Sequence, residues 1–115
     1  MVVFQVAGGC GLGALDAAKA KGVWGVGVDA DQSFLGTHIL TSALKGVDTA
    51  VYLSIKDAKN GHFKGGQDSV YGLAEHGVGL GKFSPNAPKG IESKVDAIRQ
   101  EIVSGKIKNI PTTVP

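Results

Sequence analysis

Residues 2–13 of the chain read VVFQVAGGCGLG, a short apolar run that passes directly into glycines. A β-branched apolar run of this length predicts a buried β-strand over residues 2–6, and the glycines predict a tight loop at its end. The Ala-rich residues 12–21 then predict a helix, with Gly22 as its C-terminal stop. The beginning of the chain therefore predicts a unit of strand, glycine loop and helix.

Further strands are predicted along the chain. Residues 23–28 and 38–44 predict two more strands, and the first is continuously apolar, which is typical of a sheet covered on both faces. Two weaker patterns, at residues 69–73 and 78–82, predict a hairpin-like pair of strands. The tail at residues 107–115 is interpreted as a possible edge segment.

Two more helices complete the pattern. Residues 49–60 predict a helix with Asp48 as its N-cap, and a helix is expected from Pro88 to about residue 104, with one apolar face. Strands that alternate with helices favour an α/β fold with a largely parallel sheet. We therefore expect one α/β unit over residues 1–115.

Composition and charge exclude several classes of protein. An apolar share of 43% with 19% charged residues is ordinary for a folded chain, so disorder is not expected. The 12 basic and 10 acidic residues are spread along the chain, which argues against a nucleic-acid-binding surface. The sequence has no apolar run of membrane-spanning length and no signal-peptide pattern at its start. As expressed, the chain is expected to be cytoplasmic.

Unusual residues stand at the ends of three predicted strands. Gly8 and Gly9 follow the first strand, Asp29 ends the second, and Lys45 follows the third. In parallel α/β sheets, ligands bind beyond the carboxyl ends of the strands. Glycine N–H groups can approach a ligand closely, a carboxylate can accept two hydrogen bonds from a diol, and a lysine can donate to the same ligand. The sequence thus predicts a ligand-binding site at Gly8, Gly9, Asp29 and Lys45.

Other interpretations of these residues stay open at this point. The glycine loop could be a tight turn without a ligand, and Gly9, Gly11 and Ala14 also form a fragment similar to the dinucleotide-binding GxGxxG motif, with Asp29 near the position of its acid. Asp29 could cap its own loop, Asp31 could form an Asx turn, and Lys45 could be a solvated turn residue.

Catalysis and metal binding are not expected. Cys10 stands at a predicted helix N-terminus, but the sequence places no base beside it. The histidines at 38, 62 and 76 lack the spacing of a metal site. We expect no enzyme activity, no cofactor and no metal.

Four segments, in order, are similar to the basic membrane protein family, which includes the purine nucleoside receptor lipoproteins of bacterial ABC importers. The similarity covers nearly the whole chain and is carried by Val3–Gly9 with Gly11–Gly13, Gly27–Gln32, Leu40–Lys45 and Tyr71–Leu80. Two departures are Cys10, where the family often has a small hydroxyl residue, and Glu75-His76, in place of a more usual acid–glycine pair.

The resemblance implies a type I periplasmic-binding-protein fold, in which two Rossmann-like lobes close on a ligand. This chain would be a single partial domain, the C-terminal lobe without the first lobe, and residues 49–60 would form a helix that crosses between lobes. Asp29 would then be the ribose-binding acid, Lys45 its lysine partner, and the backbone at Gly8 and Gly9 would face the nucleoside.

The expected function is therefore capture of a purine nucleoside for an ABC importer permease. The intact family member would be extracytoplasmic and anchored to the cell membrane. The isolated lobe would expose its inter-lobe face, so we expect a homo-oligomer. Two alternatives remain: a small nucleotide-binding enzyme or regulator that uses the loop at Gly8–Gly13, or an inactive truncated fragment that self-associates.

Overall fold

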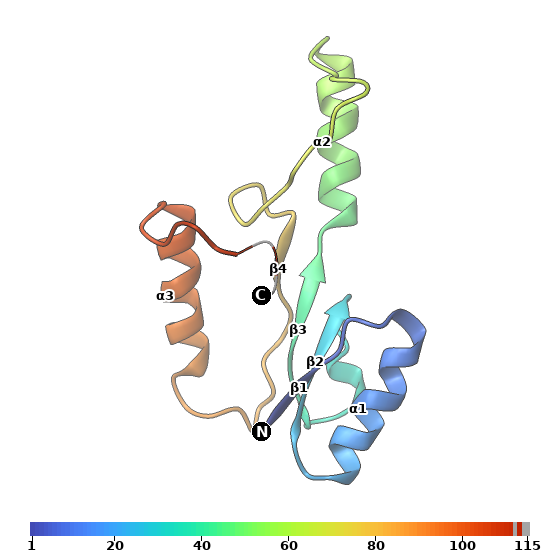
Figure 1. The fold of residues 1–115 in the computed structure, drawn as a ribbon, viewed down its shortest axis with the longest axis vertical. Coiled ribbons are helices and arrows are strands. Elements are labelled where there is room, and N and C mark those ends of the chain that lie inside the picture. Colours follow the sequence, from blue (N-terminus) through green and yellow to red (C-terminus); the bar gives the residue numbers. More distant parts are fainter. Residues whose placement is uncertain (112, 114–115) are drawn as a thin grey trace.

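A four-stranded sheet forms the centre of the chain in a computed structural model that describes residues 1–111 and 113 (Figure 1). The strands are β1 (Val2–Phe4), β2 (Trp24–Asp29), β3 (Ile39–Lys45) and β4 (Val78–Leu80), and they lie side by side in that order. The first three pair in parallel, whereas β4 is antiparallel to β3. The predicted α/β fold with a largely parallel sheet is confirmed.

Among the residues that the structure describes, three helices accompany the sheet: α1 (Gly11–Ala20), α2 (Val47–Lys59) and α3 (Ile91–Val103). Two short 3-10 turns, η1 (Gly8–Cys10) and η2 (Ser33–Leu35), follow β1 and β2.

Two helix starts differ from the prediction. The N-cap of α2 is Gly46, so the prediction that Asp48 caps this helix is wrong; Asp48 lies in the first turn, where its negative charge suits the helix dipole. Helix α3 begins three residues after Pro88, because Gly90 has a φ of 79° and breaks the helical path before Ile91.

The predicted strand at residues 69–73 is absent, and with it the hairpin. A tight turn occupies this part of the chain: the Gly77 N–H donates to the Gly72 carbonyl at 2.9 Å, and the Gly72 N–H donates to the Glu75 carboxylate at 2.8 Å. In place of the predicted hairpin, strand β4 pairs with β3. In the predicted tail, residues 107–111 and 113 form no strand, and residues 112, 114 and 115 lie outside the described residues.

The core lies between α1 and one face of the sheet. Leu15 of α1 is fully buried and Ile39 of β3 nearly so. A Cβ at Gly25 would lie 2.7 Å from the Leu15 Cδ2 atom and 3.3 Å from the Ile39 Cδ1 atom. Glycine at this position of β2 therefore allows α1 to approach the sheet closely.

The opposite face of the sheet is covered less well. A cavity of about 510 Å³ separates α3 from β3 and β4, and apolar side chains such as Leu44, Phe83 and Ile98 line it. Helix α3 has no buried residue. The expected covering on both faces is therefore complete only on the α1 side.

Helix α2 extends beyond the carboxyl end of β3, away from the sheet (Figure 1). It has no buried residue, and its apolar side chains Val51, Tyr52 and Ile55 are more than half exposed. No helix in the described part of the chain is both long and apolar enough to cross a membrane.

A backbone hydrogen bond joins the start of α2 to the segment that returns from it. The Gly46 N–H donates to the Gly77 carbonyl at 2.8 Å, which ties the start of α2 to the residue before β4. A Cβ at Gly46 would lie 2.7 Å from the His76 carbonyl oxygen, so only glycine fits this contact without a shift of the backbone.

Candidate functional site

Asp29 and Lys45 form an ion pair at the carboxyl edge of the sheet. Asp29 is the last residue of β2 and lies opposite Leu44 in β3, so Lys45 is next to it in the adjacent strand. The Lys45 Nζ atom is 2.8 Å from the Asp29 Oδ1 atom, and the two side chains are 60% and 54% exposed. An ion pair this exposed adds little stability, so both groups are available to a ligand.

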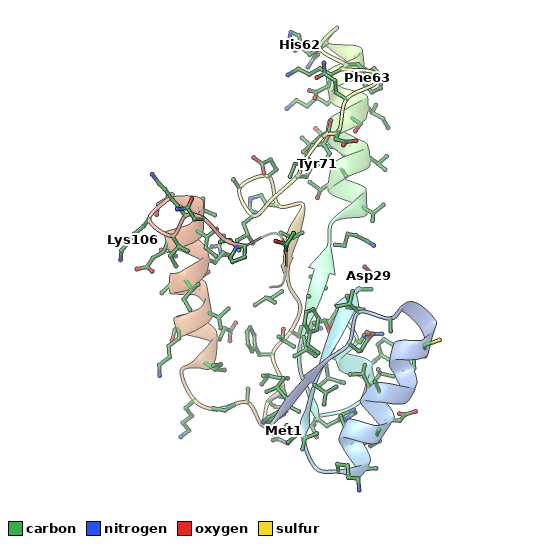
Figure 2. All side chains as sticks on the ribbon, viewed as in Figure 1. Met1, Asp29, His62, Phe63, Tyr71 and Lys106 are labelled. Carbon is green, nitrogen blue, oxygen red and sulfur yellow. The ribbon has the colours of Figure 1, made fainter. Side chains whose placement is uncertain are left out.

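The backbone at Asp29 is in the left-handed region, with a φ of 68°. Residues with a Cβ rarely adopt this conformation, and an outlier of this kind is a reason to look for a function. The Ala30 N–H donates to the Val28 carbonyl at 2.9 Å, which closes a tight turn around Asp29. The turn directs the carboxylate out of the strand at the sheet edge, as Figure 2 shows.

Gly8 and Gly9 lie in η1, which joins β1 to α1 at the same edge of the parallel sheet. Gly8 has a φ of 54°, and a Cβ at either position would meet no atom within 4 Å. Within the described residues, neither Gly8 N–H nor Gly9 N–H has an acceptor, whereas the Cys10 N–H donates to the Ala7 carbonyl at 3.2 Å. The loop thus presents two unused donors in open space.

The structure brings together only part of the predicted site. It joins Asp29 to Lys45, and it places Gly8 and Gly9 at the same edge of the sheet. Over the described ranges, no hydrogen bond joins either glycine directly to the ion pair.

A group of buried and half-buried polar side chains at this edge was missed by the sequence analysis. Gln5, which is 6% exposed, accepts a hydrogen bond from the Ala7 N–H at 3.1 Å. Gln32 accepts from the Val28 N–H at 3.0 Å, and its own N–H donates to the fully buried Ser42 hydroxyl at 3.0 Å. The signal for Gln5 was present: a polar residue within an apolar strand must find a partner when it is buried.

Asp31 forms the Asx turn that was one interpretation of this residue. Its carboxylate accepts from the Ser33 N–H at 3.0 Å. This hydrogen bond holds the pKa of Asp31 below its usual value, and the Lys82 backbone and ammonium group act in the same direction. Asp31 therefore fixes the loop after Asp29.

The remaining reactive side chains are dispersed. Cys10 is a free, exposed thiol at the end of η1. His38 precedes β3, His62 follows α2, and His76 lies before β4. Among residues 1–111 and 113, no three His, Cys, Asp or Glu side chains are grouped so that they could hold a metal ion.

Comparison with known proteins gives a family and several relatives. Residues 1–112 match the sequence model of a family described as ABC transporter substrate-binding protein PnrA-like. The "CD4+ T-cell-stimulating antigen" of Listeria monocytogenes is 38% identical, across 93% of this chain and 35% of the relative. The "ABC transporter nucleoside-binding protein BmpA" of Lactococcus lactis is 36% identical, across 92% of this chain and 35% of the relative. "Basic membrane protein D" of Borreliella burgdorferi is 37% identical, across 93% of this chain and 33% of the relative.

Solved structures give the same picture of the fold. ABC transporter solute-binding proteins from Aeropyrum pernix superpose with a TM-score of 0.68 and 31% identity, over 97% of this chain and 41% of that chain. A transcriptional activator of the comK gene from Bacillus halodurans superposes with a TM-score of 0.83 over 95% of this chain and 38% of that chain. Its sequence is 24% identical, so this likeness concerns the fold alone. The chain thus spans about a third of the length of the curated relatives it matches.

Proposed function

The chain belongs to the PnrA-like family of ABC transporter substrate-binding proteins, and from this premise we propose that it is the nucleoside-capturing lobe of an importer's receptor. The observation that carries the proposal is the Asp29–Lys45 pair, 2.8 Å apart and half exposed at the carboxyl edge of a parallel sheet. This edge is where α/β sheets bind ligands. The name of the Lactococcus relative, a nucleoside-binding protein, indicates the ligand class.

In the proposed mechanism, the ligand is a purine nucleoside that is bound and released unchanged. The Asp29 carboxylate accepts hydrogen bonds from the two ribose hydroxyls, and such bonds to a charged acceptor are among the stronger ones. Lys45 holds the carboxylate in place through the atom it already contacts and donates to a sugar oxygen. The free N–H groups of Gly8 and Gly9 face the nucleoside from the neighbouring strand end.

The geometry favours a nucleoside over a nucleotide phosphate. A phosphate-binding loop needs several consecutive free N–H groups, but the Cys10 N–H already donates to the Ala7 carbonyl and the Gly11 N–H to carbonyls of η1. The position of the third glycine in the dinucleotide motif is Ala14. The nearby Asp29 carboxylate would also repel a phosphate.

We assign this chain, residues 1–115, to the C-terminal lobe of a bilobed receptor, as a single partial domain. Helix α2 would be the element that crosses to the first lobe, because its apolar face at Val51, Tyr52 and Ile55 has nothing to cover it here. The intact receptor would be a membrane-anchored, extracytoplasmic lipoprotein that delivers its ligand to an ABC permease. In isolation, the exposed apolar face would favour self-association.

The test uses a receptor in which this chain is joined to the remaining two thirds of the family sequence. Calorimetric titration with adenosine, guanosine and inosine should give binding, and Asp29→Ala should weaken it at least tenfold, roughly 1.4 kcal/mol. Asp16→Ala, which removes an exposed carboxylate from α1, is the matched control.

A second ligand sharpens the result. 2′-Deoxyadenosine lacks one hydroxyl of the diol, so it should bind the unmodified receptor more weakly than adenosine does. In the Asp29→Ala receptor the two ligands should bind equally, because the partner of that hydroxyl has been removed. Unchanged affinity after Asp29→Ala, or an undiminished preference for adenosine, would reject the role of Asp29.

A further inference from the structure

Three loops must be held in register if one ligand is to contact Gly8, Gly9, Asp29 and Lys45. The loops follow three different strands, and none of the hydrogen bonds in the described residues joins the glycines to the ion pair directly. The ion pair itself is too exposed to fix the geometry. The edge of the sheet therefore needs another element that sets the relative positions of the loops.

Gln32 is placed to do this for the turn at Asp29. Its side-chain Oε1 atom accepts from the Val28 N–H at 3.0 Å, which closes the loop of residues 28–32 on itself. Asp29 lies inside that loop with its left-handed φ of 68°. The Gln32 N–H donates to the Ser42 hydroxyl at 3.0 Å, so the same residue attaches the loop to β3, three residues before Lys45.

Gln5 makes the corresponding connection to the glycine loop. Its Oε1 atom accepts from the Ala7 N–H at 3.1 Å, directly before Gly8. Its Nε2 atom donates to the Gln32 Oε1 atom at 3.5 Å, the longest link in the chain of contacts. The two carboxamides thus connect residues 27 positions apart in the sequence.

Two glycines provide the space for these carboxamides. A Cβ at Gly27, opposite Ser42 in the sheet, would lie 2.5 Å from the Ser42 Oγ atom and 2.8 Å from the Gln32 Oε1 atom. A Cβ at Gly11 would overlap the Gln5 carboxamide. Both contacts lie on the α1 side of the sheet, where Gln5 and Ser42 are buried. Buried and mutually bonded polar groups hold their positions more firmly than exposed ones.

We propose that Gln5, Gln32 and Ser42 form a polar bridge that positions the Gly8–Gly9 loop and the Asp29 turn for one ligand. All three are positioning residues that act through the loops they hold and do not touch the nucleoside. The effect of the bridge on ligand affinity rests on the proposed nucleoside binding. Its effect on the positions of the two loops does not depend on that proposal. Ligand specificity at this edge would then depend on residues behind the binding surface.

The main experiment measures amide hydrogen exchange by NMR in the 115-residue chain. Gln32→Met keeps the size of the side chain but removes the acceptor, so exchange of the Val28 and Ala7 amides should become about tenfold faster. Ala7 is the decisive readout, because the bridge reaches it only through Gln5. Gln32→Glu keeps an acceptor oxygen for both donors and should restore most of the protection.

Thr41→Val is the matched control. Thr41 is buried like Ser42 and adjacent to it, but its hydroxyl donates to the Gly81 carbonyl at 3.0 Å and does not reach Gln32. The variant should destabilise the chain to a similar extent and leave the Ala7 amide within about twofold of its original rate. If Gln32→Met does not fold, Gln5→Met tests the bridge in the other direction, through faster exchange at Val28.

The ligand arm uses adenosine and the joined receptor described above. Gln32→Met should weaken adenosine binding about fivefold, and Gln32→Glu should recover it, while Thr41→Val should leave it unchanged. Unaltered exchange at Ala7 in Gln32→Met, or equal acceleration in Thr41→Val, overturns the bridge. If the unmodified receptor binds no nucleoside, the proposed function fails, and the exchange data alone decide whether the bridge exists.

Discussion

Replacing Asp29 by glycine or by valine separates the contribution of its backbone from that of its carboxylate. With a φ of 68°, the residue occupies a conformation that costs a side chain with a Cβ about 1–2 kcal/mol. Glycine relieves this cost but loses about 0.5–1 kcal/mol through the greater freedom of the unfolded chain. Loss of the half-exposed ion pair with Lys45 costs at most about 1 kcal/mol. The free energy of unfolding of Asp29→Gly should therefore lie within about 1 kcal/mol of that of the unmodified chain.

Valine retains the backbone cost and adds a β-branched side chain to a left-handed residue. Aspartate tolerates this region better than β-branched residues do, so Asp29→Val should lower the free energy of unfolding by about 2 kcal/mol. Urea unfolding followed by Trp24 fluorescence measures the difference, because Trp24 begins β2 and is partly buried. Equal m-values would show that the unfolded states are comparable.

The two variants should behave alike toward the ligand. Both lack the carboxylate, so in the joined receptor both should lose at least about tenfold in adenosine affinity. If Asp29→Val proves as stable as Asp29→Gly, the left-handed turn at this residue is refuted. Near-normal affinity in Asp29→Gly would instead contradict the role of the carboxylate and leave the turn intact.

Three further predictions follow from packing, titration and exposed surface. Gly27→Ala should lower the free energy of unfolding by about 1–3 kcal/mol, because its Cβ would press on Ser42. Gly13→Ala, in open space within α1, should instead raise the free energy of unfolding by as much as about 1 kcal/mol, and equal urea midpoints of the two variants would contradict this. The pKa of Asp31 is lowered by the Ser33 N–H, so its stabilisation is present above the pKa of the unfolded chain and is lost as pH falls through the folded pKa; Asp31→Asn should flatten the acid limb of a stability–pH curve, and superimposable limbs would argue against this. The bare apolar face of α2 should make the isolated chain self-associate in sedimentation velocity, which a monodisperse monomer at working concentration would disprove.

The elements that the sequence predicted correctly are those with a strong local pattern. Residues 23–28 and 38–44 are short segments that end at a charged residue, whereas residues 12–21 are Ala-rich and end at Gly22, so composition and length separated strands from helix. The ends of β2 and β3 could also be predicted from the sequence, because a charged residue, Asp29 or Lys45, follows each segment. Asp29 and Lys45 were therefore expected at the same edge of a parallel sheet, and the structure pairs their side chains in adjacent strands. Similarity to the basic membrane protein family, inferred from four segments, is confirmed by the family match over residues 1–112.

The errors lie where partners distant in the sequence decide the structure. Residues 69–73 resemble a strand, but the Gly72 N–H and the Glu75 carboxylate close a turn there, and β4 pairs instead with β3, more than 30 residues earlier in the chain. The link between Gln5 and Gln32 spans 27 residues. A periodic pattern indicates that a side chain is buried, but it does not identify the acceptor that makes burial tolerable.

The backbone hydrogen bond between Gly46 and Gly77 attaches the start of α2 to the residue before β4, at the point where α2 leaves the sheet. A displacement of α2 along β3 would therefore have to carry Gly77 with it or break this bond. A larger side chain at Gly46 would press on the His76 carbonyl oxygen, 2.7 Å from the added Cβ, so the backbone would have to shift at the bond that holds the start of α2 to the residue before β4.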